Sequence, residues 1–133
     1  MRFIVMVMMK EESKAGPPPA NEAFVAMQKY NAEAVKAGVL LAAEGLAPTS
    51  KGARMKFGGA QPIVTDGPFA ESKEVVAGFS IIKVNSLEEA IQWVKNAPYS
   101  GGNAEVEIRK LMDIEDFGEG FTPNPEIAKV KFK

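Results

Sequence analysis

VVAGFSIIKVNSLEEAIQWVK, residues 75–95, places a long apolar strand directly before an amphipathic helix, and this pair decides the fold. Residues 75–84 are rich in β-branched and apolar side chains, which favour a strand. Ser86 and Glu89 form an S-x-x-E capping box, in which each side chain is expected to bond to the other residue's backbone amide and begin a helix. The apolar side chains that follow share one stripe at i, i+3, i+4 and i+7: Leu87, Ala90, Ile91 and Val94. Pro98 ends the predicted helix.

The same order of strand and helix occurs near the start of the chain. Residues 2–9 form an apolar run too short for a helix, which predicts a central strand buried on both faces. A proline-rich loop then precedes a helix predicted over residues 21–37, and Gly38 supplies its left-handed C-cap. A second strand is predicted over residues 39–46. The predicted apolar face of the helix carries Phe24, Met27, Asn31, Ala34 and Val35.

Short strands and turns fill the middle and the end of the chain. Residues 53–57 and 62–65 predict two short strands around a hairpin break at Gly58 and Gly59, so the centre forms a β-meander. Residues 105–111 alternate charged and apolar positions, as an outer strand does. We therefore expect one domain over residues 1–117 and an extended C-terminal tail over residues 118–133.

The predicted order is strand, helix, strand, inserted hairpin, strand, helix, strand. This order is typical of an α+β fold of the ferredoxin-like, split βαβ type. Its helices cover only one face of the sheet, and the simplest cover for the other face is the same face of a second copy, related by a two-fold axis. We therefore predict a homodimer with its sheets packed face to face.

The composition excludes several classes of chemistry. The 133 residues include no histidine and no cysteine, which excludes a Ser-His-Asp triad, a cysteine nucleophile, a disulfide and a zinc–thiolate site. Any catalysis must use carboxylates, lysine, tyrosine, hydroxyls, backbone amides or an oxygen-ligated metal. No metal-binding or cofactor-binding motif stands out, and we expect neither a metal nor a cofactor.

Charge and hydropathy predict a cytoplasmic protein. The formal net charge is −1, from 16 basic and 17 acidic residues, and this argues against a direct nucleic-acid binder because phosphate neutralisation needs a concentrated basic face. The longest apolar run, residues 3–9, is about a third of the length that a membrane helix needs. It is also too short for a signal peptide. We therefore expect no membrane association.

Residues 64–79, VTDGPFAESKEVVAGF, closely resemble the DGPF branch of the YCII-related family. Further segments match in the same order: the opening MRFIVMV, AGVLLAAEGLAP at residues 37–48, and the EVEIR of residues 105–109. The resemblance covers residues 1–117 and implies a dimeric α+β barrel, in agreement with the topology inferred above.

The resemblance also implies two kinds of activity. Some YCII-type relatives are enzymes that act on small aromatic compounds with a histidine and aspartate pair, and this chain lacks the histidine. Some DGPF-type proteins are encoded beside, or fused to, extracytoplasmic-function sigma factors. The resemblance therefore also implies a sigma-factor-related partner and a regulatory role.

Two carboxylates are the candidate catalytic groups. Asp66 ends a predicted strand, where its side chain either lines a cleft or caps an Asx-type turn in which Gly67 takes a positive φ. Glu44 interrupts an apolar strand, and burial there would make it a candidate acid or base. The alternative for Glu44 is exposure near the strand end, or an ion pair with Arg54, Lys73 or Arg109.

Four further side chains are candidate ligand contacts. Lys73 and Arg54 are the cations that would hold an anionic ligand beside these carboxylates, and the alternative for Lys73 is a solvated loop. Tyr30 and Trp93 lie near the edges of helical apolar stripes, where aromatic side chains either pack in the core or form the wall of a pocket.

These residues support competing classes of function. The first is a homodimeric module that binds a small anionic or aromatic ligand, or a transcription-associated partner, without turnover; the missing histidine favours it. The second is an enzyme that uses Asp66 or Glu44 as a base for isomerisation or elimination on a small organic acid or phenol. The third is a structural dimer with an incidental cleft. A cleft that combines Glu44, Asp66 and a cation would favour the enzyme.

Overall fold

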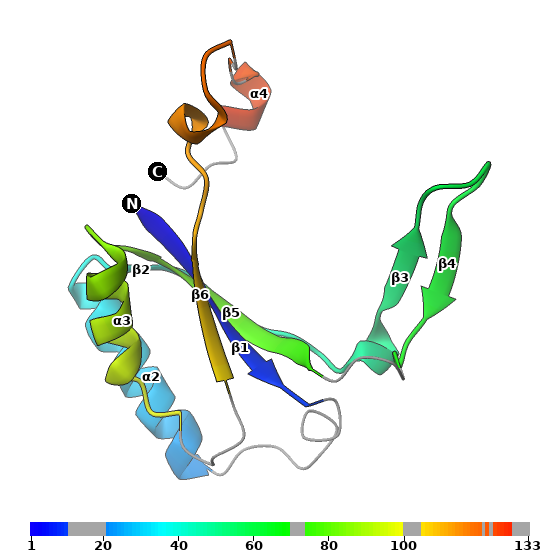
Figure 1. Cartoon of the computed structure of the whole chain (residues 1–133). Coiled ribbons are helices and arrows are strands. Elements are labelled where there is room, and N and C mark those ends of the chain that lie inside the picture. The colour runs from blue at the N-terminus through cyan, green and yellow to red at the C-terminus, as the bar shows by residue number, and fades with distance from the viewer. Residues whose placement is uncertain (11–20, 70–73, 100–104, 121, 123, 129–133) are drawn as a thin grey trace.

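The computed structural model describes residues 1–10, 21–69, 74–99, 105–120, 122 and 124–128 (Figure 1). Its main sheet is antiparallel with the strand order β2-β5-β1-β6. Two helices, α2 and α3, lie on the same side of this sheet (Figure 1). This is the ferredoxin-like α+β arrangement that the sequence predicted. The elements of this body are β1 (Arg2–Met9), α2 (Asn21–Lys36), β2 (Leu40–Gly45), β5 (Val75–Lys83), α3 (Leu87–Lys95) and β6 (Glu105–Lys110).

The predicted central meander is wrong. The two short strands β3 (Ala53–Lys56) and β4 (Ile63–Asp66) pair only with each other, and Figure 1 shows their hairpin projecting away from the main sheet. The edge strand β2 pairs directly with β5 instead. Packing β3 and β4 into the sheet would bury the charged side chains of Arg54, Lys56 or Asp66, whereas β5 offers a long apolar ladder.

The core lies between the helices and one face of the sheet. Phe3 and Val5 of β1 and Ile82 of β5 point into it, and Ala90 of α3 is fully buried against them. The other face of β1, with Ile4 and Met6, is only half-buried, so the prediction that β1 is covered on both faces is not met within one chain. We call this second surface, which faces away from α2 and α3, the open face.

The start of α3 confirms the predicted cap with one difference. The Ser86 side chain accepts a hydrogen bond from the Glu89 amide at 3.1 Å. The Glu89 carboxylate accepts from the amide of Asn85, one residue earlier than the capping box predicts, at 3.0 Å. The helix therefore begins with two orphan amides satisfied, which is the physical purpose of the box.

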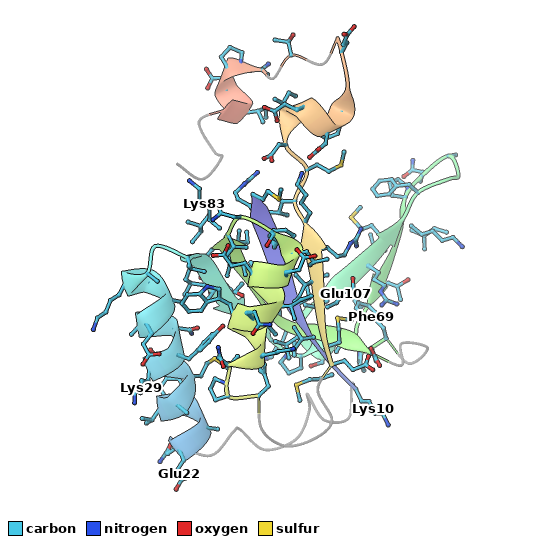
Figure 2. All side chains as sticks on the ribbon, turned by 60° about the vertical axis from the view of Figure 1, so that its left-hand side comes forward. Lys10, Glu22, Lys29, Phe69, Lys83 and Glu107 are labelled. Carbon is cyan, nitrogen blue, oxygen red and sulfur yellow. The ribbon has the colours of Figure 1, made fainter. Side chains whose placement is uncertain are left out.

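The first helix ends as predicted but buries a narrower face. Gly38 has a φ of 73°, the left-handed conformation expected of a C-cap glycine. Ala34 is buried, whereas Phe24 is 58% exposed and Val35 is 59% exposed. Glu22 and Lys29 on α2 point away from the sheet (Figure 2). The prediction of a buried apolar face is therefore correct for Ala34 and wrong for Phe24 and Val35.

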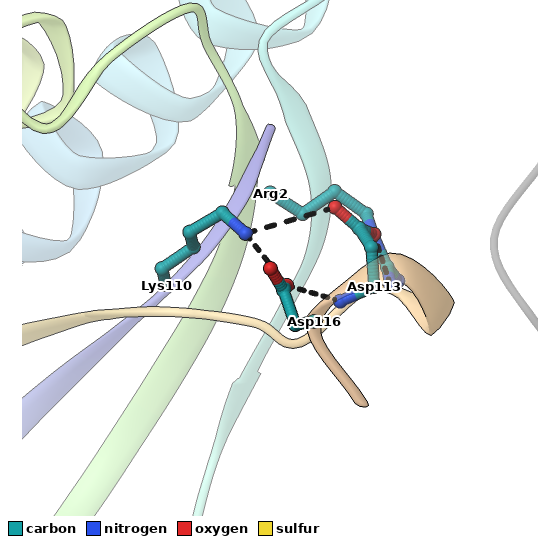
Figure 3. A network of polar contacts seen from close by, with 4 residues as sticks. All are labelled: Arg2, Lys110, Asp113 and Asp116. Atoms are coloured by element: carbon teal, nitrogen blue, oxygen red, sulfur yellow. Dashed lines mark hydrogen bonds and ion pairs between the residues drawn. The ribbon is translucent and has the colours of Figure 1, made fainter. Parts of the chain in front are cut away.

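A small charged cluster attaches the C-terminal segment to the sheet (Figure 3). The Lys110 ammonium lies 2.7 Å from Asp116 and 3.9 Å from Asp113, and Arg2 lies 3.6 Å from Asp113. Asp113 is the N-cap of the short 3-10 helix η2 (Ile114–Phe117), and Asp116 lies within this helix. Beyond it, α4 (Pro125–Ala128) is a single helical turn in the segment that we expected to be extended.

In the part of the chain that the structure describes, no helix has the length and apolarity that crossing a membrane requires.

Candidate functional site

A pocket of about 250 Å³ lies between α2, α3 and the helix-covered face of the sheet. Its apolar walls come from all of these elements, including Val5 of β1, Met27 of α2 and Trp93 of α3. Four uncharged polar side chains also line it: Tyr30, Asn31, Ser80 and Tyr99. A mostly apolar hollow with a few polar groups is the usual form of a small-molecule site.

Tyr30 and Trp93 meet in this pocket, as their positions on the two helices allowed. The Tyr30 hydroxyl donates a hydrogen bond of 2.6 Å to the backbone carbonyl of Trp93. Their rings pack edge to face with centroids 6.3 Å apart. This contact joins α2 to α3 across the pocket, so both residues help to set its width.

The two phenols of the pocket stay protonated at neutral pH. Burial, and in second place the nearby Tyr99, raises the pKa of Tyr30. Burial also raises the pKa of Tyr99. Because desolvation disfavours the phenolate, both hydroxyls are neutral hydrogen-bonding groups.

Three of the polar lining residues were not among the predicted site residues. Asn31 stood on the predicted apolar face of α2, and Ser80 interrupts the apolar strand β5. Both are polar positions where the pattern asks for an apolar one, and this is the signal that could have identified them. Tyr99 follows α3 after Pro98 and carries no comparable signal.

Glu44 lies at the edge of the pocket, and its strand pairing assigns its side chain to the other face of the sheet. In the ladder it pairs with Phe79, whereas Ala43 pairs with Ser80 and Leu40 with Ile82. Cross-strand partners share a face, so Glu44 belongs to the open face and Ala43 to the pocket side. Glu44 is exposed, and it has no ion pair with another described residue. The alternative of simple exposure therefore holds for this carboxylate.

The other predicted charged residues lie elsewhere. Asp66 is an exposed residue at the end of β4, and Arg54 of β3 stacks on the ring of Phe69 with its guanidinium carbon 4.0 Å from the ring centre. Neither lines the pocket. Lys73 lies outside the described residues. Of the predicted site residues, Tyr30, Trp93 and Glu44 thus lie at the pocket. Asp66 and Arg54 lie away from it.

Gly67 has a different role from the predicted one. Its φ is not positive, so the turn that we expected there is wrong. A Cβ atom at Gly67 would instead collide with the carbonyl oxygen of Thr49, in the 3-10 turn η1 (Thr49–Lys51). The Gly67 amide donates to the carbonyl of Gly52 at 3.0 Å. The D-G-P-F motif therefore fixes the base of the β3–β4 hairpin through a close backbone contact.

Comparison with known proteins agrees with this architecture. The sequence profile of the YCII-related domain matches residues 1–115. The chain belongs to the YCII-related family. An uncharacterized protein of Rhizobium meliloti (strain 1021) is 41% identical to this YCII-related chain over 75 residues. That match spans 54% of the chain and 60% of the relative, which is itself uncharacterized, so it indicates no activity.

The YCII-related domain presents no metal-binding cluster among the residues that the structure describes. No group of three or more acidic side chains comes together there in a way that could hold an ion. The chemistry of the site rests on the pocket itself, with its aromatic walls and uncharged polar groups.

Proposed function

We propose that this YCII-related protein binds a small, uncharged, ring-containing compound in the pocket between α2, α3 and the sheet. One observation carries the proposal: the pocket combines apolar and aromatic walls with Tyr30, Asn31, Ser80 and Tyr99, and its described lining includes no lysine or arginine. An uncharged ring with a hydroxyl or amide group uses both features, because it buries apolar area and pairs with the polar side chains.

The size of the pocket supports a single-ring ligand. An apolar cavity of about 150 Å³ is large enough to hold benzene. The pocket has about 250 Å³, which leaves space for one or two substituents. For seven or eight non-hydrogen atoms at about 0.6 kcal/mol each, we expect dissociation constants of roughly 0.1–1 mM for simple fragments.

The charge of the lining argues against the anionic ligand that the sequence allowed. Arg54, one of the two expected cations, lies on the β3–β4 hairpin against Phe69. A carboxylate or phenolate entering the pocket would lose its hydration without gaining a cation among the described lining residues. The enzyme hypothesis weakens for the same reason, because Asp66 lies outside the pocket and Glu44 belongs to the open face.

We also propose that the functional unit is a homodimer formed through the open faces. On this side Ile4, Met6 and Phe79 are only half-buried, and nothing among the described residues packs over them as α2 and α3 do on the other side. A single sheet face of this kind needs a second layer to exclude water. Light scattering on a size-exclusion column tests the dimer, and a monomer throughout the micromolar range would exclude it. The sigma-factor-related partner stays a prediction from the resemblance.

The fluorescence of Trp93 provides the test of ligand binding. This side chain is the only tryptophan in the sequence and lies in the pocket wall, so its emission reports on occupancy. We expect phenol, indole and benzyl alcohol to bind saturably and to raise the melting temperature, and benzoate to bind at least tenfold more weakly. Equal binding of benzoate would contradict the uncharged ligand.

A pair of leucine substitutions locates the binding. Ala43→Leu adds side-chain volume on the pocket side of β2 and is expected to weaken phenol binding at least tenfold. Ala32→Leu is the matched control, because Ala32 is exposed on α2 and does not line the pocket. If both variants bind phenol as the unmodified protein does, the ligand does not occupy this pocket.

A further inference from the structure

Three polar side chains of the pocket make no hydrogen bond with another described residue. They are Asn31 of α2, Ser80 of β5 and Tyr99 after α3, and all three are half-buried. Tyr30 differs from them, because its hydroxyl donates to the Trp93 carbonyl. A half-buried polar group without a protein partner pairs with water or with a ligand. These three side chains therefore mark the positions at which a bound ligand would form hydrogen bonds.

Asn31 and Tyr30 leave α2 on different sides of its pocket-lining face. The helix advances about 100° per residue, so the two side chains point about 100° apart. Tyr30 points toward α3, since its ring and its hydroxyl both contact Trp93. Helix α2 packs beside β2 and α3 beside β6, and these strands are the two edges of the main sheet. Asn31 therefore lies on the β2 side of the pocket.

Ser80 lies in the pocket floor on this same side. Its strand, β5, is the neighbour of β2, and Ser80 pairs there with Ala43. Tyr99 lies on the other side of the pocket, because it follows α3, the helix beside β6. The pocket thus has an amide and a hydroxyl toward β2, a phenol toward β6 and mostly apolar side chains elsewhere in its wall.

The side chains on the β2 side fit a ligand group that both donates and accepts hydrogen bonds. Asn31 offers N–H donors and a carbonyl acceptor, and the Ser80 hydroxyl donates and accepts. A carboxamide has donors and an acceptor as well, so it can pair with both residues at once, and it carries no charge. A carboxylate only accepts, and it would lose its hydration without gaining a lysine or arginine among the described lining residues. The Tyr99 hydroxyl, on the other side, fits a single hydroxyl group of the ligand.

We propose that the ligands of this pocket are uncharged aromatic rings with a carboxamide at one end, bound by Asn31 and Ser80, and a hydroxyl at the opposite end, bound by Tyr99. This inference rests on the proposed binding of an uncharged ring and specifies the substituents of that ring. The volume agrees with it, because about 250 Å³ exceeds a benzene-sized cavity of about 150 Å³ by enough for two small substituents. Asn31, Ser80 and Tyr99 are then the specificity-determining residues of the site.

Benzamide and toluene test the carboxamide end. Each has one ring with one substituent, and only the substituent of benzamide forms hydrogen bonds. Asn31→Leu keeps a similar side-chain volume and removes the amide, so we expect benzamide to bind about tenfold more weakly and toluene to stay within about threefold of its original affinity. Ser80→Ala is expected to weaken benzamide about fivefold. Gln28→Leu is the matched control, because Gln28 is exposed on α2 and does not line the pocket. The emission of Trp93 follows each titration.

The isomers of hydroxybenzamide test the opposite end. We expect para-hydroxybenzamide to bind about fivefold more tightly than benzamide, and meta-hydroxybenzamide to gain less than about twofold, because its hydroxyl does not lie opposite the carboxamide. Tyr99→Phe keeps the ring and removes the hydroxyl, so it should abolish the gain of the para isomer. Asn31→Leu should leave that gain in place, because the two ends of the ligand bind separate side chains.

The outcomes separate this inference from the proposed function. If phenol, indole and benzyl alcohol do not bind, the proposed function is wrong, and this inference is wrong with it. If they bind, but Asn31→Leu and Ser80→Ala weaken benzamide no more than toluene, the carboxamide class is wrong while the proposed function stands. Equal binding of the two hydroxybenzamide isomers, or a para gain that survives Tyr99→Phe, overturns the position of the hydroxyl. Toluene binding shows that a variant keeps a folded pocket, and if Asn31→Leu loses it, Ser80→Ala and the isomer comparison on the unmodified chain decide.

Discussion

At Gly67, a methyl group would occupy the space of the Thr49 carbonyl, which is part of the backbone and cannot rotate away as a side chain can. We therefore expect Gly67→Ala to displace the base of the β3–β4 hairpin and to lower the free energy of unfolding by about 1–3 kcal/mol, as overpacking does elsewhere. Gly52→Ala is the matched control, because its Cβ would lie 3.6 Å from the same oxygen, an ordinary contact. Urea unfolding and limited proteolysis of residues 53–66 measure the effect. Equal stability of the two variants would show that the contact of Gly67 with the Thr49 carbonyl does not position the β3–β4 hairpin.

The hydroxyl of Tyr30 joins the two helices that form the pocket. Tyr30→Phe keeps the edge-to-face ring contact and removes the hydrogen bond to the Trp93 carbonyl, at an expected cost of about 1 kcal/mol in unfolding free energy. Tyr99→Phe is the comparison, because the Tyr99 hydroxyl makes no hydrogen bond with another described residue, and a smaller cost is expected there. A larger loss in Tyr99→Phe would reverse the assignment of these two phenols.

The charged cluster near η2 predicts a stability window in pH (Figure 3). The Lys110 hydrogen bond, followed by that from the Asp113 amide, lowers the pKa of Asp116. The Asp116 hydrogen bond raises the pKa of Lys110. The contribution of Asp116 to folding stability is therefore complete above the pKa that this carboxyl has in the unfolded chain, and it is lost as pH falls through the lowered pKa of the folded state. The contribution of Lys110 to folding stability is complete below the pKa that this amine has in the unfolded chain, and it is lost as pH rises through the raised pKa of the folded state.

Nuclear magnetic resonance can follow the acid end of this pH window. We expect the Asp113 amide resonance to titrate in acid with the Asp116 carboxylate, because the amide donates to Asp116 at 2.8 Å. Asp116→Asn removes the titrating group and should abolish that acid transition while the rest of the fold is unchanged. An identical transition in the variant would assign it to another carboxylate.

The sequence predicted those features of the helices and strands that depend on neighbouring residues in one segment. The boundaries of α3 follow from Ser86, Glu89 and the apolar spacing, all within one segment. The face on which Glu44 lies depends instead on an irregularity between Leu40 and Ala42 in the pairing of β2 with β5. Without this bulge, alternation would place Glu44 on the same face as Leu40, toward the helices. The sequence shows no sign of the bulge, so the predicted role of Glu44 did not anticipate its place on the open face.

The difference between local patterns and long-range pairing also explains why the β3–β4 hairpin was predicted but its separation from the main sheet was not. The hairpin break at Gly58 and Gly59 is local chemistry, and the two strands were predicted within one or two residues of β3 and β4. Their separation from the main sheet depends on whether β3 pairs with the outer edge of β2, the edge that does not face β5. That choice compares long-range ladders, which no single segment encodes.

The cap of α3 gives a prediction at this scale. Ser86→Ala removes the acceptor of the Glu89 amide, and we expect a loss of about 1 kcal/mol in unfolding free energy. Ser86→Thr retains the hydroxyl and should keep most of the stability. Thermal unfolding followed by circular dichroism compares them, and a threonine variant as unstable as alanine would indicate that packing, rather than the cap, sets the cost.

For the whole molecule, the main sheet separates two proposed functions. Ser80 and Ile82 of β5 line the pocket, while Ile81 alternates onto the open face where the second copy is proposed to bind. Phe79 pairs with Met6 on the open face and also reaches the edge of the pocket. The described pocket lining has no lysine or arginine, and strand pairing places the Glu44 side chain on the open face, which fits the proposed binding of an uncharged ligand. The proposed ligand and the proposed second copy would contact opposite faces of the same strand, so substitutions can test them separately.

A dimer that unfolds to separate chains must gain stability with concentration, because association stabilises only the folded form. A tenfold increase in protein concentration adds about 1.4 kcal/mol per dimer, or about 0.7 kcal/mol per chain, which raises the melting temperature of a domain of this size by roughly 2–3 °C. The double substitution Ile4→Ser with Met6→Ser removes apolar area from the open face, so its melting temperature should depend less on concentration. Phe24→Ser, at an exposed residue on α2 and away from the open face, should retain the full dependence. If all three proteins show the same slope, the apolar side chains of the open face make no contribution to association, and the proposed dimer through this face is wrong.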